Sequence, residues 1–396
     1  MTSNYLLPTR RVTACAGLSQ LINWGISFYM PGTFSSAVAA QTGWSSTFIY
    51  GGLTLAMLMM AAVSPFVARF LSLFGGQQVL IIGTLFITAG CITLALPASK
   101  ITWLVAWSII GIGMRLSLYD TLFSVLVGLY GPASGRVISK VALFGGMASV
   151  VFWPLGTWLL THLSWHAVVL IYACTGLMNA GLLLVVPNQK SLMRKKIQHA
   201  AKTPANPLPA TLYALFIALM TFVSNGTSTH MPELIASCGL PVTVGMLWGI
   251  GQTGSRLLDV LSGSRLTPVQ LAIITSALIP LCFLLALTGT HFACAIAGFI
   301  LGYGAVNGLM TVVKATLPLQ LFSLEHYAER TGILLIPAQL LAAISPFFWA
   351  WLNSHVGIKG TLWCSLLLGL AIASLAILLA NLIRTQQQFS EQQSSI

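Results

Sequence analysis

The sequence has 396 residues, of which 57% are hydrophobic and only 6% are Asp, Glu, Lys or Arg. Soluble proteins carry roughly a quarter charged residues, so this chain lacks the side chains needed to cover a water-facing surface. The formal net charge of +12 does not indicate nucleic-acid binding, because the basic residues lie singly or in small groups between apolar runs. The composition predicts an integral membrane protein.

Apolar runs follow one another along the whole chain. The first is about 22 residues long and exceeds the apolar core of a cleaved signal peptide, so we expect it to be retained as a span. Backbone groups in lipid must be satisfied within the segment, which makes each run a helix. The predicted spans are 12–33, 46–70, 78–97, 102–127, 138–161, 166–186, 210–231, 242–261, 269–288, 292–314, 331–352 and 361–383.

The two halves of the sequence resemble each other. Arg69 near the end of span two matches Arg256 in span eight, and Gly111-Ile112-Gly113 in span four matches Gly302-Tyr303-Gly304 in span ten. Arg136 and Pro154 around span five match Arg330 and Pro346 around span eleven. We therefore predict two six-helix bundles, residues 1–189 and 210–396, joined by a cytoplasmic linker over 190–209. Such repeats place a site at the middle of the membrane.

The basic residues predict the orientation of the chain. Lys100 and Lys359 fall on one side, Arg115 lies within a span, and the other Lys and Arg residues fall at the opposite side. Lys and Arg favour the cytoplasmic side, so both termini are expected to be cytoplasmic.

No cofactor or metal site is predicted. The seven cysteines include no Cys-x-x-Cys pair, and the sequence contains no phosphate-binding loop, zinc spacing or nucleophile motif. An enzyme or an ATP-driven pump would need such a motif, so neither is expected.

Four short motifs carry a family resemblance, and they are Thr42-Gly43-Trp44-Ser45, Gly111-Ile112-Gly113 with Leu118-Tyr119-Asp120, Gly145-Gly146-Met147-Ala148-Ser149 with Trp153-Pro154-Leu155, and Thr316-Leu317-Pro318-Leu319. On these motifs the chain resembles the major facilitator superfamily, and within it the bacterial oxalate/formate antiporters and monocarboxylate porters. The resemblance implies an all-α membrane protein of twelve spans in two six-helix bundles, with spans one, four, seven and ten lining a central cavity.

The chain departs from this family in the loop between spans two and three. Ser72 stands where the family has an acid, and Gly76 and Gln77 stand where it has basic residues. The inner gate is therefore expected to contain fewer charge–charge contacts near Arg69. In the second half, Asp259 is retained.

Arg115 is the clearest candidate for contacting a substrate. A charged side chain inside a span is costly and is functional by default. Its guanidinium suits a carboxylate, and Tyr119 lies one turn further along the same face. The alternative is a structural ion pair. Asp120 lies five residues on, about 140° around a continuous helix, so the two are not expected to pair directly.

Asp120 and Arg256 have two interpretations each. Asp120 carries a proton, or it is a gate residue that pairs with Arg136 or Arg330. Arg256 resembles a substrate-contacting arginine of monocarboxylate porters, or it closes a gate with Asp259. Gln252 stands where those porters often have an acid, which weakens a proton-coupling role.

Polar residues at helical spacing complete the predicted site. Asn23 and Trp24 in span one, Asn225 in span seven and Asn307 in span ten lie on such stripes, which indicate a face turned away from lipid. Hydrogen bonding between helices is the alternative for each asparagine. His230 and Glu233 lie at the outer end of span seven, where they form an outer gate or a proton-entry point, or have an ordinary wet-loop role.

The sequence therefore predicts a secondary active transporter for a small organic anion, coupled to protons or to a counter-anion. It is expected to act as a monomer in a bacterial inner membrane. One alternative is a proton-driven exporter of drugs or hydrophobic metabolites. A sensor or assembly factor is a third, which the lack of extramembrane mass disfavours.

Overall fold

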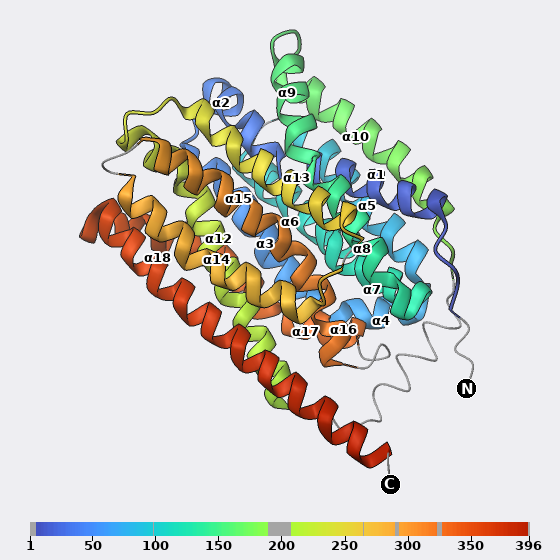
Figure 1. The fold of residues 1–396 in the computed structure, drawn as a ribbon. Helices are drawn as coiled ribbons and strands as arrows, with labels where there is room; N and C mark the ends of the chain where they lie inside the picture. The colour runs from blue at the N-terminus through green and yellow to red at the C-terminus, as the bar shows by residue number, and fades with distance from the viewer. Residues whose placement is uncertain are drawn as a thin grey trace. The chain divides into compact units, whose positions relative to one another are not determined.

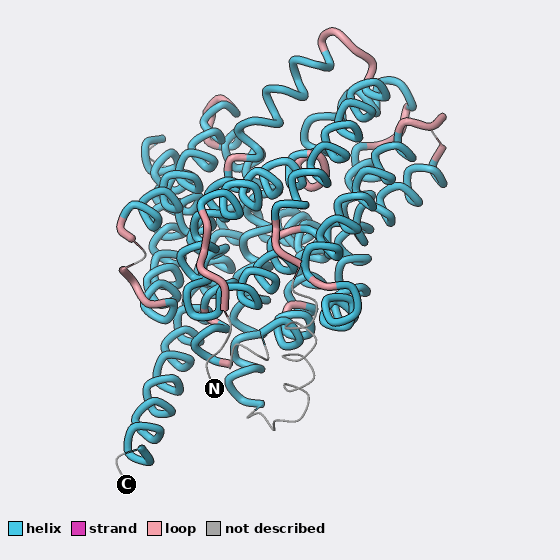
Figure 2. The backbone as a smooth tube through the Cα atoms, turned by 90° about the vertical axis from the view of Figure 1, so that its right-hand side faces the viewer, coloured by secondary structure: helices cyan, strands magenta, loops and turns pink. Residues whose placement is uncertain are grey.

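The computed structural model describes residues 5–97, 99–188, 207–263, 265–289, 293–322 and 327–394. Most of the predicted linker over 190–209 lies outside these residues. The described chain is helical and contains no strand (Figure 2). It divides into two compact units, Met1–Thr203 with Leu324–Ile336, and Pro204–Ser323 with Pro337–Ile396.

The first unit holds most of the helices drawn from blue to green in Figure 1. Its helices are α1 (Arg10–Gly25), α2 (Met30–Thr42), α3 (Ser46–Val63), η1 (Ser64–Phe66), α4 (Val67–Phe74), α5 (Gly76–Leu94), α6 (Lys100–Ser117), α7 (Tyr119–Tyr130), η2 (Gly131–Ala133), α8 (Ser134–Gly146), α9 (Ala148–Leu160), α10 (Trp165–Leu182), η3 (Leu183–Val185) and α17 (Tyr327–Leu334). Although α17 comes late in the sequence, it packs against η1, α4 and α7.

The second unit contains fewer and longer helices. They are α12 (Pro207–Ser237), η4 (Val242–Gly245), α13 (Met246–Leu261), α14 (Pro268–Thr288), α15 (Ala293–Thr316), α16 (Pro318–Leu321) and α18 (Ile336–Ser394). Most of span eleven and all of span twelve lie within α18, where Gly357 turns the chain with a φ of 69°. Glycine is suited to this turn because it adopts positive φ without steric cost.

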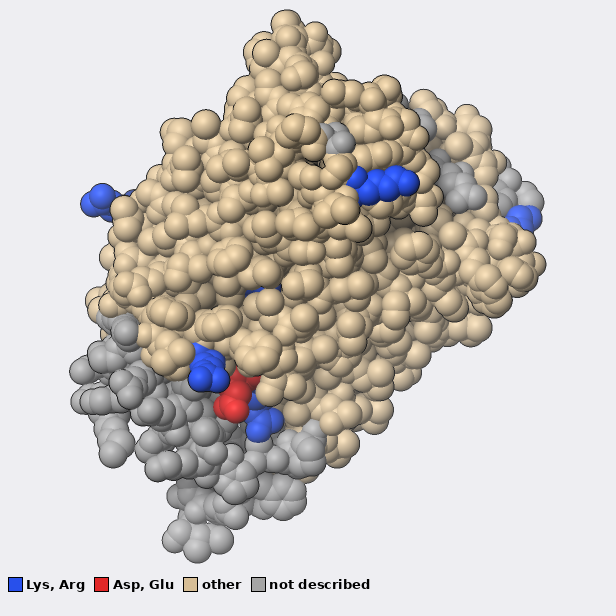
Figure 3. Space-filling model, turned by 180° about the vertical axis from the view of Figure 1, so that it is seen from behind, with Lys and Arg blue, Asp and Glu red and all other residues tan. Residues whose placement is uncertain are grey.

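The helices account for the predicted spans. Eight described segments are long and apolar enough to cross a membrane, and two of them, Lys100–Leu160 and Tyr327–Thr385, each contain two predicted spans. The two remaining predicted spans correspond to α1 with α2 and to α13, in which the separate helices are short. The face drawn in Figure 3 is mostly uncharged, as lipid contact requires. The predicted all-α membrane fold is confirmed.

Several predicted spans are not continuous α-helices: span two contains η1, span eleven breaks at Leu335 between α17 and α18, and three others are interrupted as follows. Span one breaks at Ile26–Tyr29 and resumes in α2, which continues to Thr42. Span four breaks at Leu118, and span five breaks at Met147. Hydropathy does not show these interruptions, because the apolar character continues through them.

Candidate functional site

The break in span four brings Arg115 and Asp120 together. Leu118 is extended, with φ −78° and ψ −175°, between the end of α6 and the start of α7. Arg115 Nη1 lies 3.8 Å from Asp120 Oδ2 as a result. The expectation that these residues do not pair directly was wrong, because it assumed a continuous helix.

The polar groups that the break releases are satisfied by side chains. Thr121 Oγ1 donates to the Arg115 carbonyl at 2.6 Å, and Gln20 Nε2 donates to the Ser117 carbonyl at 2.8 Å. Arg115 lies in the last turn of α6 and Asp120 in the first turn of α7. Both charges are at the helix end that stabilises them. The break is therefore stabilised by specific hydrogen bonds and by the position of the two charges.

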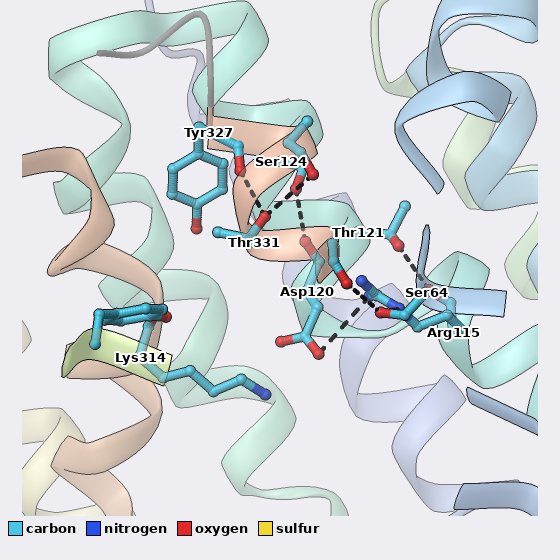
Figure 4. Close-up of polar contacts among 11 residues, drawn as sticks. Ser64, Arg115, Asp120, Thr121, Ser124, Lys314, Tyr327 and Thr331 are labelled. Carbon is cyan, nitrogen blue, oxygen red and sulfur yellow. Dashed lines mark hydrogen bonds and ion pairs between the residues drawn. The ribbon is translucent and has the colours of Figure 1, made fainter. Parts of the chain in front are cut away.

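Ser64 connects Arg115 to α17. Arg115 Nε donates to Ser64 Oγ at 2.8 Å, and Ser64 Oγ donates to the Gly332 carbonyl at 2.6 Å (Figure 4). The Arg115 side chain is only 2% exposed. Sequence reasoning missed Ser64, although a polar residue before Pro65 inside a span was a usable signal. These contacts favour the structural ion pair for Arg115, and its substrate role stays a prediction.

Arg256 occupies a different environment in the second unit. Its Nε donates to the Gly308 carbonyl at 3.1 Å, and its Nη2 donates to Thr311 Oγ1 at 2.8 Å. The side chain is 3% exposed, and Nη1 has no hydrogen-bond partner in the described chain. Asp259 lies one turn along α13, also buried, with an unbonded Oδ2. Among the described residues, no carboxylate lies within ion-pair distance of Arg256.

Equivalent helix pairs hold the two arginines. A Cβ on Gly111 of α6 would lie 2.7 Å from Ala56 Cα of α3, and a Cβ on Gly304 of α15 would lie 2.9 Å from Trp248 Cα of α13. Gly111 therefore corresponds to Gly304, and the predicted match of Gly111 with Gly302 was two residues out of register.

In the corrected alignment, the buried arginines of the two units lie on helices that are not equivalent, because Arg115 lies on α6 and Arg256 lies on α13. Arg115 lies one turn after Gly111, and the corresponding residue after Gly304 is Gly308. Arg256 lies two turns after Trp248, and the corresponding residue after Ala56 is Ser64, so the predicted match of Arg69 with Arg256 was also out of register. Each unit thus joins the same two positions by a hydrogen bond from an Arg Nε. Among the described residues, an acid lies within ion-pair distance of that arginine in the first unit alone.

Asn23 lies in a buried hydrogen-bond network between helices. Asn23 Nδ2 donates to Thr84 Oγ1 at 3.0 Å, and Asn179 Nδ2 donates to Asn23 Oδ1 at 2.8 Å. All three side chains are fully buried. The network joins α1, α5 and α10, which favours the interhelical alternative for Asn23. Sequence reasoning did not single out Asn179, a lone amide in span six.

The other predicted substrate residues lie in both units. Trp24 is half-buried against Tyr119, with ring centroids 5.1 Å apart, and the Tyr119 hydroxyl donates to the Ala142 carbonyl at 2.9 Å. Asn307 is half-buried and accepts from Ser224 Oγ at 2.6 Å. Asn225 is also half-buried.

The predicted gate residues differ in their exposure. Arg69 and Arg136 are exposed, and Arg330 is half-buried on α17. His230 lies in α12, the helix of span seven, and its Nε2 is 3.0 Å from the Pro346 carbonyl. The Glu233 side chain lies outside the described residues.

Comparison with known proteins decides the family. The model of the Major Facilitator Superfamily matches residues 14–318, which is more than half of the chain. The chain belongs to the major facilitator superfamily. It is therefore a multi-pass membrane transporter and not an enzyme.

Solved structures of this superfamily have the same fold. The proton:xylose symporter XylE, bound to 6-bromo-6-deoxy-D-glucose, is 13% identical, with a TM-score of 0.77 over 92% of this chain and 94% of that one. The human organic anion transporter MFSD10 (TETRAN) is 14% identical, with a TM-score of 0.74 over 94% of this chain and 100% of that one. No curated protein sequence matches this chain. At these identities the likeness concerns the fold alone.

Proposed function

We propose that this transporter moves a small organic anion, such as a carboxylate, by alternating access, and that Arg256 binds the anion. The observation that carries the proposal is the unbalanced charge of Arg256. A charged side chain inside a membrane protein costs several kcal/mol unless it is compensated. Arg115 is compensated by Asp120, whereas the partners of Arg256 in the described part of the chain are a carbonyl and a hydroxyl.

The free Nη1 donor gives Arg256 a way to hold its ligand. Two of the guanidinium nitrogens are fixed by α15, so the orientation of the group is set before an anion arrives. A carboxylate that accepted from Nη1 would form a charge-assisted hydrogen bond and supply the missing negative charge. Asn225 and Asn307 are proposed as neutral polar groups for the rest of the ligand.

Asp259 is the residue we propose for coupling. It lies one turn from Arg256, is buried and has an unbonded Oδ2. When no anion is bound, a side chain at this position can approach the guanidinium, and when an anion binds it would be displaced. Asp120, by contrast, is proposed to position Arg115, with Arg69, Arg136 and Arg330 at the cytoplasmic gate.

The fold does not select the substrate, because XylE carries a sugar and MFSD10 organic anions within one architecture. The proposal therefore depends on the residues of this chain. We further propose a monomer in a bacterial inner membrane with both termini cytoplasmic, on the distribution of Lys and Arg.

Counterflow in proteoliposomes tests the proposal. A panel of mono- and dicarboxylates would be compared in the wild type, Arg256→Gln, Arg256→Lys and the control Arg384→Gln, which alters an exposed arginine. We expect Arg256→Gln to lose at least about tenfold in uptake, since hydrogen bonds to charged groups contribute about 1.5–3 kcal/mol. Arg256→Lys should retain part of it, because it keeps the charge without the planar fork.

Two results would overturn the proposal. Wild-type uptake of carboxylates by Arg256→Gln would remove Arg256 from anion binding. Uptake of hydrophobic compounds, with none of any carboxylate in the panel, would favour the drug exporter.

A further inference from the structure

A small pocket lies in the first unit, where α3, α6 and α10 begin. Its walls include two leucines, three tryptophans and two hydroxyl residues, and the last five are Trp44, Trp103, Trp165, Ser99 and Thr102. The space that it encloses, its opening included, is about 170 Å³. Pockets that hold drug-sized ligands have roughly 300–1,000 Å³. This pocket therefore suits a small ion.

The N-terminal ends of three helices meet at the pocket. Trp44 comes just before the N-cap of α3, Ser99 is the N-cap of α6, and Trp165 is the first residue of α10. All three N-caps are serines, and none of the three first turns contains an acidic residue. A neutral hydroxyl satisfies a backbone N–H but leaves the positive end of the helix dipole uncompensated. Helix ends of this kind favour the binding of anions.

Lys100 adds a positive side chain next to the pocket. It follows Ser99 as the first residue of α6, and its Nζ lies 5.7 Å from the centroid of the Phe48 ring. Phe48 in turn packs edge-to-face on Trp44, with ring centroids 5.2 Å apart. None of the residues that line the pocket is acidic. The charges around the pocket therefore favour an anion over a cation.

Two of the pocket tryptophans have unused hydrogen-bond donors. Trp103 and Trp165 are 5% and 4% exposed, and the Nε1 of each is buried with no partner among the described residues. Trp103 Nε1 is directed to α3, since a Cβ on Gly52 would lie 2.7 Å from it. Trp165 Nε1 is thus the indole donor left for a ligand. A buried donor without an acceptor is costly, so its presence calls for a bound acceptor.

We infer that this pocket binds a halide-sized inorganic anion, with Trp165 Nε1 as a hydrogen-bond donor and the N-terminus of α6 as a source of positive charge. Ser99 Oγ and Thr102 Oγ1 lie 2.7 Å apart, so one hydroxyl donates to the other and one hydrogen is left for the ion. A bound anion compensates the helix dipoles and stabilises the first unit. The pocket contains neither Arg115 nor Arg256, so its ion is distinct from the proposed cargo.

Thermal unfolding in detergent tests the inference, with sodium chloride replacing sodium gluconate at constant ionic strength. Gluconate is too large for the pocket. When chloride reaches about ten times its dissociation constant, we expect the unfolding temperature of the wild type to be about 3 °C higher than in gluconate. The rise should saturate with chloride concentration, as binding to one site requires.

Three variants identify the pocket as the site. Trp165→Phe keeps a ring and removes the N–H, so it should lose most of the rise. Trp107→Phe is the matched control, because Trp107 is also buried with an unpartnered Nε1 but does not line the pocket. It should keep the rise. Arg256→Gln should keep it as well, whereas its loss in that variant would assign the chloride to Arg256 and overturn the pocket site.

Crystals of the wild type grown in sodium bromide locate the ion directly. We expect an anomalous peak within hydrogen-bond distance of Trp165 Nε1. No peak in the pocket, or an equal chloride-dependent rise in Trp165→Phe and the wild type, would overturn the inference. A peak without any chloride-dependent rise in the wild type would indicate an adventitious ion only and would overturn it too. Because the crystals need no variant, misfolding of Trp165→Phe would not prevent a decision.

Discussion

Arg115 and Asp120 form an ion pair at 3.8 Å across the extended residue Leu118, although they are five positions apart in the sequence. The interruption of span four therefore does two things. It brings the buried guanidinium of Arg115 close to the carboxylate of Asp120, and it places each charge at the helix end that stabilises it. Ser64 then ties the same guanidinium to Gly332 of α17.

Breaking this pair is expected to destabilise the first unit. Arg115→Gln leaves Asp120 without its cation, and Asp120→Asn leaves Arg115 uncompensated. Removal of one partner of a buried ion pair costs about 3–5 kcal/mol, and Asp120 is 12% exposed, so about 3 kcal/mol is expected for each variant. Thermal and denaturant unfolding in detergent measures it.

The double variant supplies the control for this prediction. If the residues act through each other, Arg115→Gln with Asp120→Asn should be less destabilised than the sum of the single variants. Additive losses would mean that the ion pair contributes nothing to stability.

The close crossings of α3 with α6 and of α13 with α15 depend on glycine. Gly111→Ala would place a methyl group 2.7 Å from Ala56 Cα, and Gly304→Ala would place one 2.9 Å from Trp248 Cα. We expect a loss of about 1–3 kcal/mol in unfolding free energy for each, as for other overpacked positions.

Matched glycines in the partner helices provide the controls for these crossings. A Cβ on Gly51 of α3 or on Gly254 of α13 would have nothing within 4 Å. Gly51→Ala and Gly254→Ala should unfold at the wild-type temperature or slightly above, since alanine favours the helix. Equal effects in crossing and control positions would contradict the packing described above.

The amide network of α1, α5 and α10 is expected to stabilise the first unit. Asn179→Ala removes the donor to Asn23 Oδ1 in a fully buried setting, which should cost about 1–3 kcal/mol. Asn381→Ala, at an exposed position of α18, is the control and should have little effect. An unfolding temperature for Asn179→Ala equal to that of the wild type would show that the network is dispensable.

The sequence predicted the helical membrane fold and the superfamily, because hydropathy and helical spacing act over twenty residues at a time. It did not predict the break at Leu118. That break depends on Thr121 and on Gln20 of another helix, whose contacts no local pattern reveals. Arg115 and Arg256 could both be predicted as buried cations, but not which of them is uncompensated. That difference depends on the tertiary contact of Arg115 with Asp120.

Discrimination between an anion and its neutral isostere tests the central claim most directly. Transport of a carboxylate and of its amide would be measured in proteoliposomes with the wild type and with Arg256→Gln. We expect the wild type to prefer the carboxylate by at least about tenfold, and the variant to lose most of that preference. Equal transport of both compounds by the wild type, or a full preference in Arg256→Gln, would contradict the account.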